Sequence, residues 1–90
     1  MIEKIGECAM LEQLAEEATE LAQAALKLAR KLRRENPTPK TLDECKRNLR
    51  EEYTDVVQCA REFNLYEDED QIRAKRARFN ERWDEMQMNN

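Results

Sequence analysis

The carboxylates of this chain recur at one spacing in two related segments. Residues 16–25 read EEATELAQAA and residues 51–60 read EEYTDVVQCA. In each copy a glutamate is followed three positions later by a second acid. These acids are Glu17 and Glu20 in the first copy, and Glu52 and Asp55 in the second. The chain contains no histidine, and all-oxygen ligand sets favour Mg²⁺, for which Mn²⁺ can substitute, over Zn²⁺. The repeated acids therefore predict a divalent-metal site.

Both segments also carry the apolar periodicity of amphipathic helices. At about 100° per residue, each segment has one apolar stripe with alternating spacings of three and four. The first stripe comprises Leu11, Leu14, Ala18, Leu21, Ala25, Leu28 and Leu32, and the second comprises Leu42, Cys45, Leu49, Tyr53, Val56, Ala60 and Phe63. Glu17 lies about 60° and Glu20 about 120° to one side of the first stripe. Glu52 and Asp55 repeat these offsets to within roughly 10° and in the same sense.

On both helices the acids lie at the same angles from the apolar stripe and on the same side of it. If the two helices pack antiparallel along their stripes, these acids come together. The four carboxylates would then face one another at the edge of the helix pair. Such a cluster is tolerated at neutral pH when a cation joins the carboxylates or when some of them are protonated. The alternative interpretation is an ordinary solvated helix face, because charged residues make up 40% of the chain.

Local signals place the helices that must position these acids. A first helix is predicted to run to about Arg34 and to be broken by the Asn-Pro-Thr-Pro segment at 36–39. Thr41 and Glu44 form a capping box, so a second helix should begin near Leu42 and end near Phe63, with Asn64 as a left-handed cap. A third helix is predicted to begin in the acidic run at 67–70. The predicted fold is all-α, with a long antiparallel helix pair and a third helix.

Composition limits the class of protein further. Ninety residues make a single domain, spanning 1–90, and a net charge of −4 argues against a nucleic-acid-binding module. Three cysteines without a C-x-x-C spacing predict small buried side chains in a reducing compartment rather than disulfides. The sequence has no apolar run of membrane-spanning length and no signal-peptide core. A cytoplasmic protein that contacts neither nucleic acid nor membrane is predicted.

The third predicted helix carries a basic cluster and an apolar stripe. Lys75, Arg78 and Arg82 follow helical spacing and could bind a polyphosphate, although a solvated face is the simpler interpretation. The stripe of Ile72, Phe79, Trp83 and Met86 predicts core or interface. Ala15, Ala22, Ala24 and Ala29 on the first helix would allow another helix to approach closely. A homodimer or a dimer of dimers, assembled as a helical bundle, is therefore expected.

Taken together, these residues resemble the all-α NTP pyrophosphohydrolases, and in particular their MazG-like group. That family's signature is EExxE followed, after a spacer, by ExxD, with a later stretch containing Lys and Arg. The matching positions are Glu16, Glu17 and Glu20, then Glu52 and Asp55, then Lys75 and Arg78. The long, Pro-interrupted connection and the RFNERW ending favour the MazG-like branch over the phosphoribosyl-ATP pyrophosphatases, which have a similar EEATE segment.

The resemblance implies Mg²⁺-dependent hydrolysis of a nucleoside triphosphate to the monophosphate and pyrophosphate, as in house-cleaning or nucleotide-pool control. It implies that Glu17, Glu20, Glu52 and Asp55 hold Mg²⁺ and carry the catalysis. Lys75, Arg78 and Arg82 would contact the substrate phosphates, and Glu16 would have a supporting role. Three alternatives remain open: a non-catalytic helical interaction module, a phosphoribosyl-ATP pyrophosphatase, and a catalytically inactive relative that binds metal or nucleotide.

Overall fold

The chain folds into helices only, over the part that the computed structural model describes, residues 1–34 and 39–89. The elements are α1 (Ile2–Ile5), α2 (Glu7–Arg33), α3 (Leu42–Arg61) and α4 (Glu69–Met88). The all-α prediction is confirmed. The short α1 was not anticipated; Gly6, with φ of 88°, separates it from α2. That positive φ is a backbone conformation that glycine adopts without steric cost.

The ends of α3 and α4 are set by local hydrogen bonds. The hydroxyl of Thr41 accepts a hydrogen bond from the Glu44 amide, 3.1 Å away, which confirms the predicted cap. Asn64, with φ of 55°, is left-handed as predicted, but α3 ends at Arg61 and its C-cap is Glu62, two residues before Asn64. The carboxylate of Asp68 accepts from the Gln71 amide at 3.0 Å and so begins α4. The predicted helix break at 36–39 lies, except for Pro39, outside the described residues.

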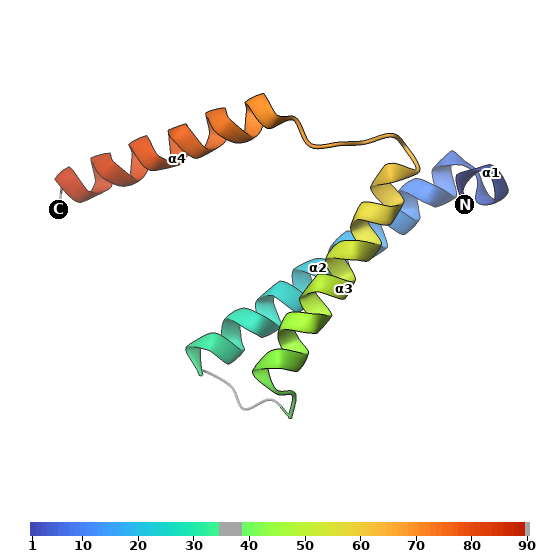
Figure 1. Ribbon diagram of the computed structural model, residues 1–90, viewed down its shortest axis with the longest axis horizontal. Coiled ribbons are helices and arrows are strands. Elements are labelled where there is room, and N and C mark those ends of the chain that lie inside the picture. The colour runs from blue at the N-terminus through green and yellow to red at the C-terminus, as the bar shows by residue number, and fades with distance from the viewer. Residues whose placement is uncertain (35–38, 90) are drawn as a thin grey trace.

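Helices α2 and α3 form the body of the molecule. They lie side by side and run in opposite directions, as Figure 1 shows. Their contact buries four small or flexible side chains, those of Met10, Ala24, Cys45 and Cys59. Small side chains at these positions let the two backbones approach closely. The contact is therefore narrow, and most of the remaining apolar side chains stay partly exposed.

The side of each helix that faces its neighbour differs from the prediction. Leu11, Leu32 and Tyr53, expected on the buried stripes, are 51%, 60% and 58% exposed. The buried positions Met10 and Ala24 were not on the predicted stripe. Both helices are rotated by about 60° in the same sense, relative to the predicted stripes. The predicted stripes were wrong because the apolar arc of α2 spans more than half of its circumference, so periodicity alone did not specify which part α3 covers.

This rotation gives the hairpin two different sides. Glu17 and Glu52, predicted beside the contact face of their helices, instead lie on that face, and both are half-buried. Glu20 and Asp55 now lie about 60° to one side, which is the acidic side of the hairpin. The other side presents the uncovered part of the apolar arc, which we call the apolar side. On α2 its exposed members are Leu11, Ala15, Ala18, Ala22, Ala25, Leu26 and Leu32.

Helix α4 lies against no other helix in the part of the chain that the structure describes. An extended segment leads from the end of α3 to α4, which runs away from the hairpin (Figure 1). The predicted stripe of this helix is exposed within the protomer: Ile72 by 43%, Phe79 by 65%, Trp83 by 52% and Met86 by 56%. The stripe was predicted to be either core or interface. In the protomer it is not part of the core.

At the open end of the hairpin, α1 is tied to the segment after α3. The Met1 amine lies 2.9 Å from a carboxylate oxygen of Glu62, and the Ile2 amide donates to the same oxygen at 2.7 Å. Hydrogen bonding to Glu62 raises the pKa of the amine above 8.0. The same hydrogen bond, together with the one from Ile2, lowers the pKa of Glu62 below 4.5. Both shifts favour the charged pair.

We expect this pair to stabilise the folded chain over a defined pH window. The raised amine pKa contributes stability below pH 8.0 that is lost as pH rises through the folded-state value. The lowered Glu62 pKa contributes stability above pH 4.5 that is lost as pH falls through the folded-state value. Glu62→Gln should therefore lower Tm at pH 6 to 7, by an amount that shrinks toward pH 10. Equal Tm differences at both pH values would contradict this account.

Candidate metal centre

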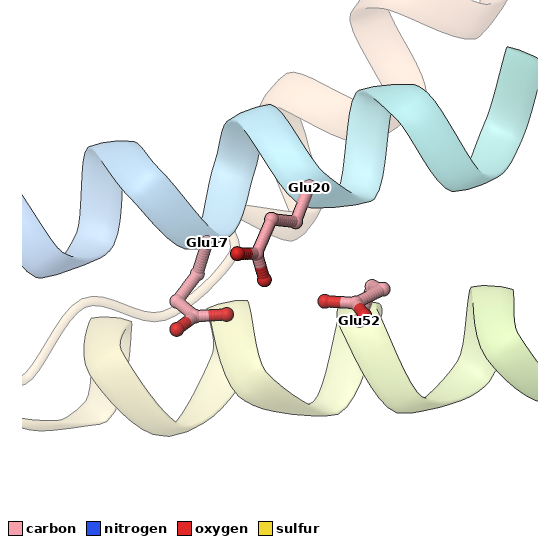
Figure 2. Close-up of side chains that lie close together, drawn as sticks. All are labelled: Glu17, Glu20 and Glu52. Carbon is pink, nitrogen blue, oxygen red and sulfur yellow. The ribbon is translucent and has the colours of Figure 1, made fainter.

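Three of the four predicted ligands come together between α2 and α3. One carboxylate oxygen each of Glu17, Glu20 and Glu52 lies within 4.8 Å of the other two. Figure 2 shows Glu17 and Glu20 projecting from α2 toward α3, while Glu52 reaches from α3 into the same space. The two copies of the repeated acidic segment thus meet across the hairpin. They meet because the helices are antiparallel and the offsets in the two copies are equal.

Two of these carboxylates are partly enclosed. The side-chain amide of Gln13 donates to Glu17 Oε1 at 2.8 Å. Glu17 Oε2 and Glu52 Oε2 are buried atoms without a hydrogen-bond partner among the described residues. Two unit charges at most 4.8 Å apart repel by roughly 3 kcal/mol at an effective dielectric constant near 20. A divalent cation bound to both oxygens would remove the repulsion and replace the hydrogen bonds they lack.

Asp55, the fourth predicted ligand, does not belong to this group of three. It is half-buried one helical turn after Glu52, toward the buried thiol of Cys59. Burial, followed by the negative charges of Glu17 and Asp55, raises the pKa of that thiol. Cys59 is therefore a neutral thiol beside the carboxylates at neutral pH. Glu16, given a supporting role by the resemblance, is exposed and outside the group.

The three cysteines should differ sharply in reactivity. Cys45 and Cys59 are buried as predicted, being 4% and 3% exposed, but Cys8 is exposed and the prediction for it was wrong. A thiol reacts as the thiolate, and the raised pKa of Cys59 disfavours that form. Under native conditions we expect one fast-reacting thiol per chain with an aromatic disulfide reagent, and three in denaturant. The fast phase should disappear in Cys8→Ser. A fast phase that persists in this variant would show that the α2–α3 contact opens readily.

A groove opens between α2 and α3 on the apolar side of the hairpin. It has a volume of about 430 Å³. Its lining comprises Leu21, Leu49 and Tyr53 together with Lys46 and Arg50. Its lining thus combines two cations and an aromatic ring with two leucines. It lies on the side of the hairpin opposite to Glu20 and Asp55.

The predicted phosphate ligands are not brought to the carboxylates within this chain. Lys75, Arg78 and Arg82 are exposed on α4, which lies apart from the hairpin (Figure 1). Their spacing on one helix is as predicted, but their proximity to the acids is not observed in the protomer. A role in binding phosphate would require α4 to approach a hairpin.

Two residues of this centre, Gln13 and Cys59, were not predicted to belong to it from the sequence. Gln13 lies four positions before Glu17, a helical spacing that places their side chains on one face. That spacing was available in the sequence as a signal. Cys59 was predicted to be buried, and its proximity to Asp55 follows from the i,i+4 spacing on α3, but its position beside Glu17 depends on how α3 is rotated against α2. Periodicity did not determine that rotation.

Comparison of the chain with protein-family models, curated proteins and solved structures finds no match. Among the described residues, no helix combines the length and apolar character needed to cross a membrane.

Proposed function

We propose that the protein is a Mg²⁺-dependent nucleoside triphosphate pyrophosphohydrolase, which releases pyrophosphate and a nucleoside monophosphate. The observation that supports this most directly is the convergence of Glu17, Glu20 and Glu52 from two copies of one segment. Two of their oxygens are buried and lack hydrogen-bond partners among the described residues. The resemblance of the EExxE and ExxD motifs to the MazG-like group agrees with this chemistry.

The residues of the centre suggest a division of roles. Bound Mg²⁺, or Mn²⁺ in its place, would neutralise phosphate charge and acidify a coordinated water. Glu17 and Glu52 would hold the ion from opposite helices, with Gln13 orienting Glu17 through its hydrogen bond. Glu20 is exposed and would complete the ligand set on the solvent side. Asp55, outside the group of three, is free to hold a further ion or to accept the proton of the attacking water.

The substrate's phosphates would approach from the acidic side of the hairpin, where metal ions would offset the negative charge. The resemblance assigns phosphate contacts to Lys75, Arg78 and Arg82, which would stabilise the departing pyrophosphate. For this role an α4 helix must come close to the carboxylates. We propose that this occurs in a homodimer or a dimer of dimers, since the protomer leaves the apolar side and α4 uncovered.

A panel of nucleoside triphosphates, canonical and damaged, tests the proposal directly. Phosphoribosyl-ATP belongs in the panel because of the related EEATE segment. We expect Mg²⁺-dependent release of pyrophosphate, rather than orthophosphate, from at least one member. Release of orthophosphate would place bond cleavage elsewhere and contradict the proposal.

The second candidate is a non-catalytic helical interaction module, which the exposed apolar residues of α4 favour. It predicts neither pyrophosphate release nor a response to Mg²⁺. A catalytically inactive relative would bind Mg²⁺ but release no pyrophosphate. Measuring both properties on the same preparation therefore separates the three possibilities.

A further inference from the structure

The apolar stripe of α4 contacts no other helix among the residues that the structure describes. Phe79 and Trp83 are stacked, with their ring centroids 6.5 Å apart and their planes 14° from parallel. The rings nevertheless remain 65% and 52% exposed. Exposed aromatic clusters of this kind mark sites of protein association. A helix that keeps such a stripe exposed lacks the packing that usually stabilises helices in water.

The charges around the stripe specify the chemistry of its partner. Lys75 and Arg82 lie within about 70° of the stripe centre on one side, and Arg76 lies about 50° away on the other. The acids Glu81 and Glu85 lie on the opposite face of the helix. The partner surface must therefore be apolar, have small side chains that leave room for two rings, and carry carboxylates along its edges.

The first half of α2 has these properties. Residues 7–22 contain five acids and no lysine or arginine. Their uncovered apolar face consists mainly of small side chains, those of Ala15, Ala18 and Ala22, with Leu11 at one end. Glu7 lies at one edge of this face, and Glu12 lies beyond the other. Small side chains on α2 would admit the large rings of α4, and the charges at the edges are complementary.

We infer that α4 of one copy of this chain packs on the first half of α2 of a second copy, in a reciprocal exchange that forms a homodimer. Reciprocal contacts of this kind close with two-fold symmetry and leave no α4 unpaired. The dimer does not depend on the proposed enzymatic activity. It does revise that proposal, because Lys75 and Arg82 would then face the acids at the edges of α2 rather than substrate phosphates, and only Arg78 would remain as a candidate for phosphate.

The geometry of the connection between α3 and α4 favours docking of α4 on a second copy of the chain rather than on its own hairpin. The Arg61 guanidinium lies over the Tyr66 ring, 4.1 Å from its centroid, and Arg61 donates to the Leu65 carbonyl at 3.2 Å. Together with the left-handed Asn64, these contacts direct the connection away from the hairpin, as Figure 1 shows. With the connection held in this direction, α4 starts out pointing away from its own α2.

Charge repulsion also argues against the groove on the apolar side as the docking site of α4. Lys46 and Arg50 line that groove, and they would face Lys75 and Arg82 across it. Like charges placed opposite one another oppose association. The first half of α2, which carries only acids, has no such conflict.

Paired charge reversals test the dimer. Sedimentation of the full chain should show a dimer, and emission from Trp83, the sole tryptophan, should shift to shorter wavelength as the dimer forms. Reversal on α2 (Glu7→Lys with Glu12→Lys) or on α4 (Lys75→Glu with Arg82→Glu) should weaken the dimer by on the order of a hundredfold. An equimolar mixture of the two variants should restore it, because both reciprocal contacts then pair opposite charges. Glu85→Lys, on the opposite face of α4, is the matched control and should leave the dimer intact.

Three results would overturn the inference. A monomer with solvent-exposed Trp83 emission means that α4 does not dock, and a monomer with shielded emission means that it folds onto its own chain. A dimer that withstands both reversals uses a different surface. None of these readouts involves turnover, so the dimer and the proposed activity can fail separately.

Discussion

Replacing Glu52 by glutamine is expected to lower Mg²⁺-dependent pyrophosphate release by at least about a hundredfold, with the helical content unchanged. Glu52 is the one member of the three-carboxylate group supplied by α3, and its buried oxygen has no other partner among the described residues. The amide keeps the shape of the side chain but removes the charge that would bind the ion. Turnover should be measured on a substrate identified in the triphosphate panel, with helicity followed by circular dichroism.

Glu51→Gln is the matched control for this variant. It is the same substitution one residue earlier, on an exposed side chain that lies outside the group. It should leave turnover unchanged. Asp55→Asn should also reduce turnover, and if Asp55 accepts the proton of the attacking water, Mg²⁺ binding should persist in that variant. Full activity in Glu52→Gln would mean that the metal site has been assigned to the wrong residues.

Mg²⁺ itself is expected to raise the Tm of the protein substantially. An ion that binds only the folded state at a hundred times its Kd contributes about 2.7 kcal/mol. For a chain of this size that corresponds to roughly 10–20 °C. The physical cause is the relief of repulsion among the three carboxylates and the coordination of the two unpartnered oxygens. Differential scanning calorimetry with and without Mg²⁺ measures the effect.

Glu17→Gln should abolish that response and, without metal, melt at a higher temperature than the unsubstituted chain. One of the mutually repelling charges is gone, while an amide can still pair with Gln13. Glu51→Gln should respond to Mg²⁺ as the unsubstituted chain does, because Glu51 is exposed and apart from the centre. Equal Mg²⁺ responses in the two variants would show that the ion binds at some other place.

The local structure of the chain was predictable because its causes are local. The hydroxyl of Thr41 and the left-handed Asn64 act on the backbone within a few residues, so the limits of α3 could be predicted closely. The repeated spacing of the acids was likewise contained in the sequence. It correctly predicted that Glu17 and Glu20 would approach Glu52, since equal offsets on antiparallel helices face each other.

The tertiary structure decided which part of each helix is buried and where α4 lies. Hydrophobic burial has no direction of its own, and the apolar arc of α2 is wider than one neighbouring helix can cover. The close approach at Ala24, Cys45 and Cys59 selected one part of that arc. This choice placed Glu17 and Glu52 inside the contact, left Asp55 outside the group of three acids, and kept the face with Ala15 and Ala18 open. The course of the connection toward α4 involves contacts around Arg61 that no periodicity predicts.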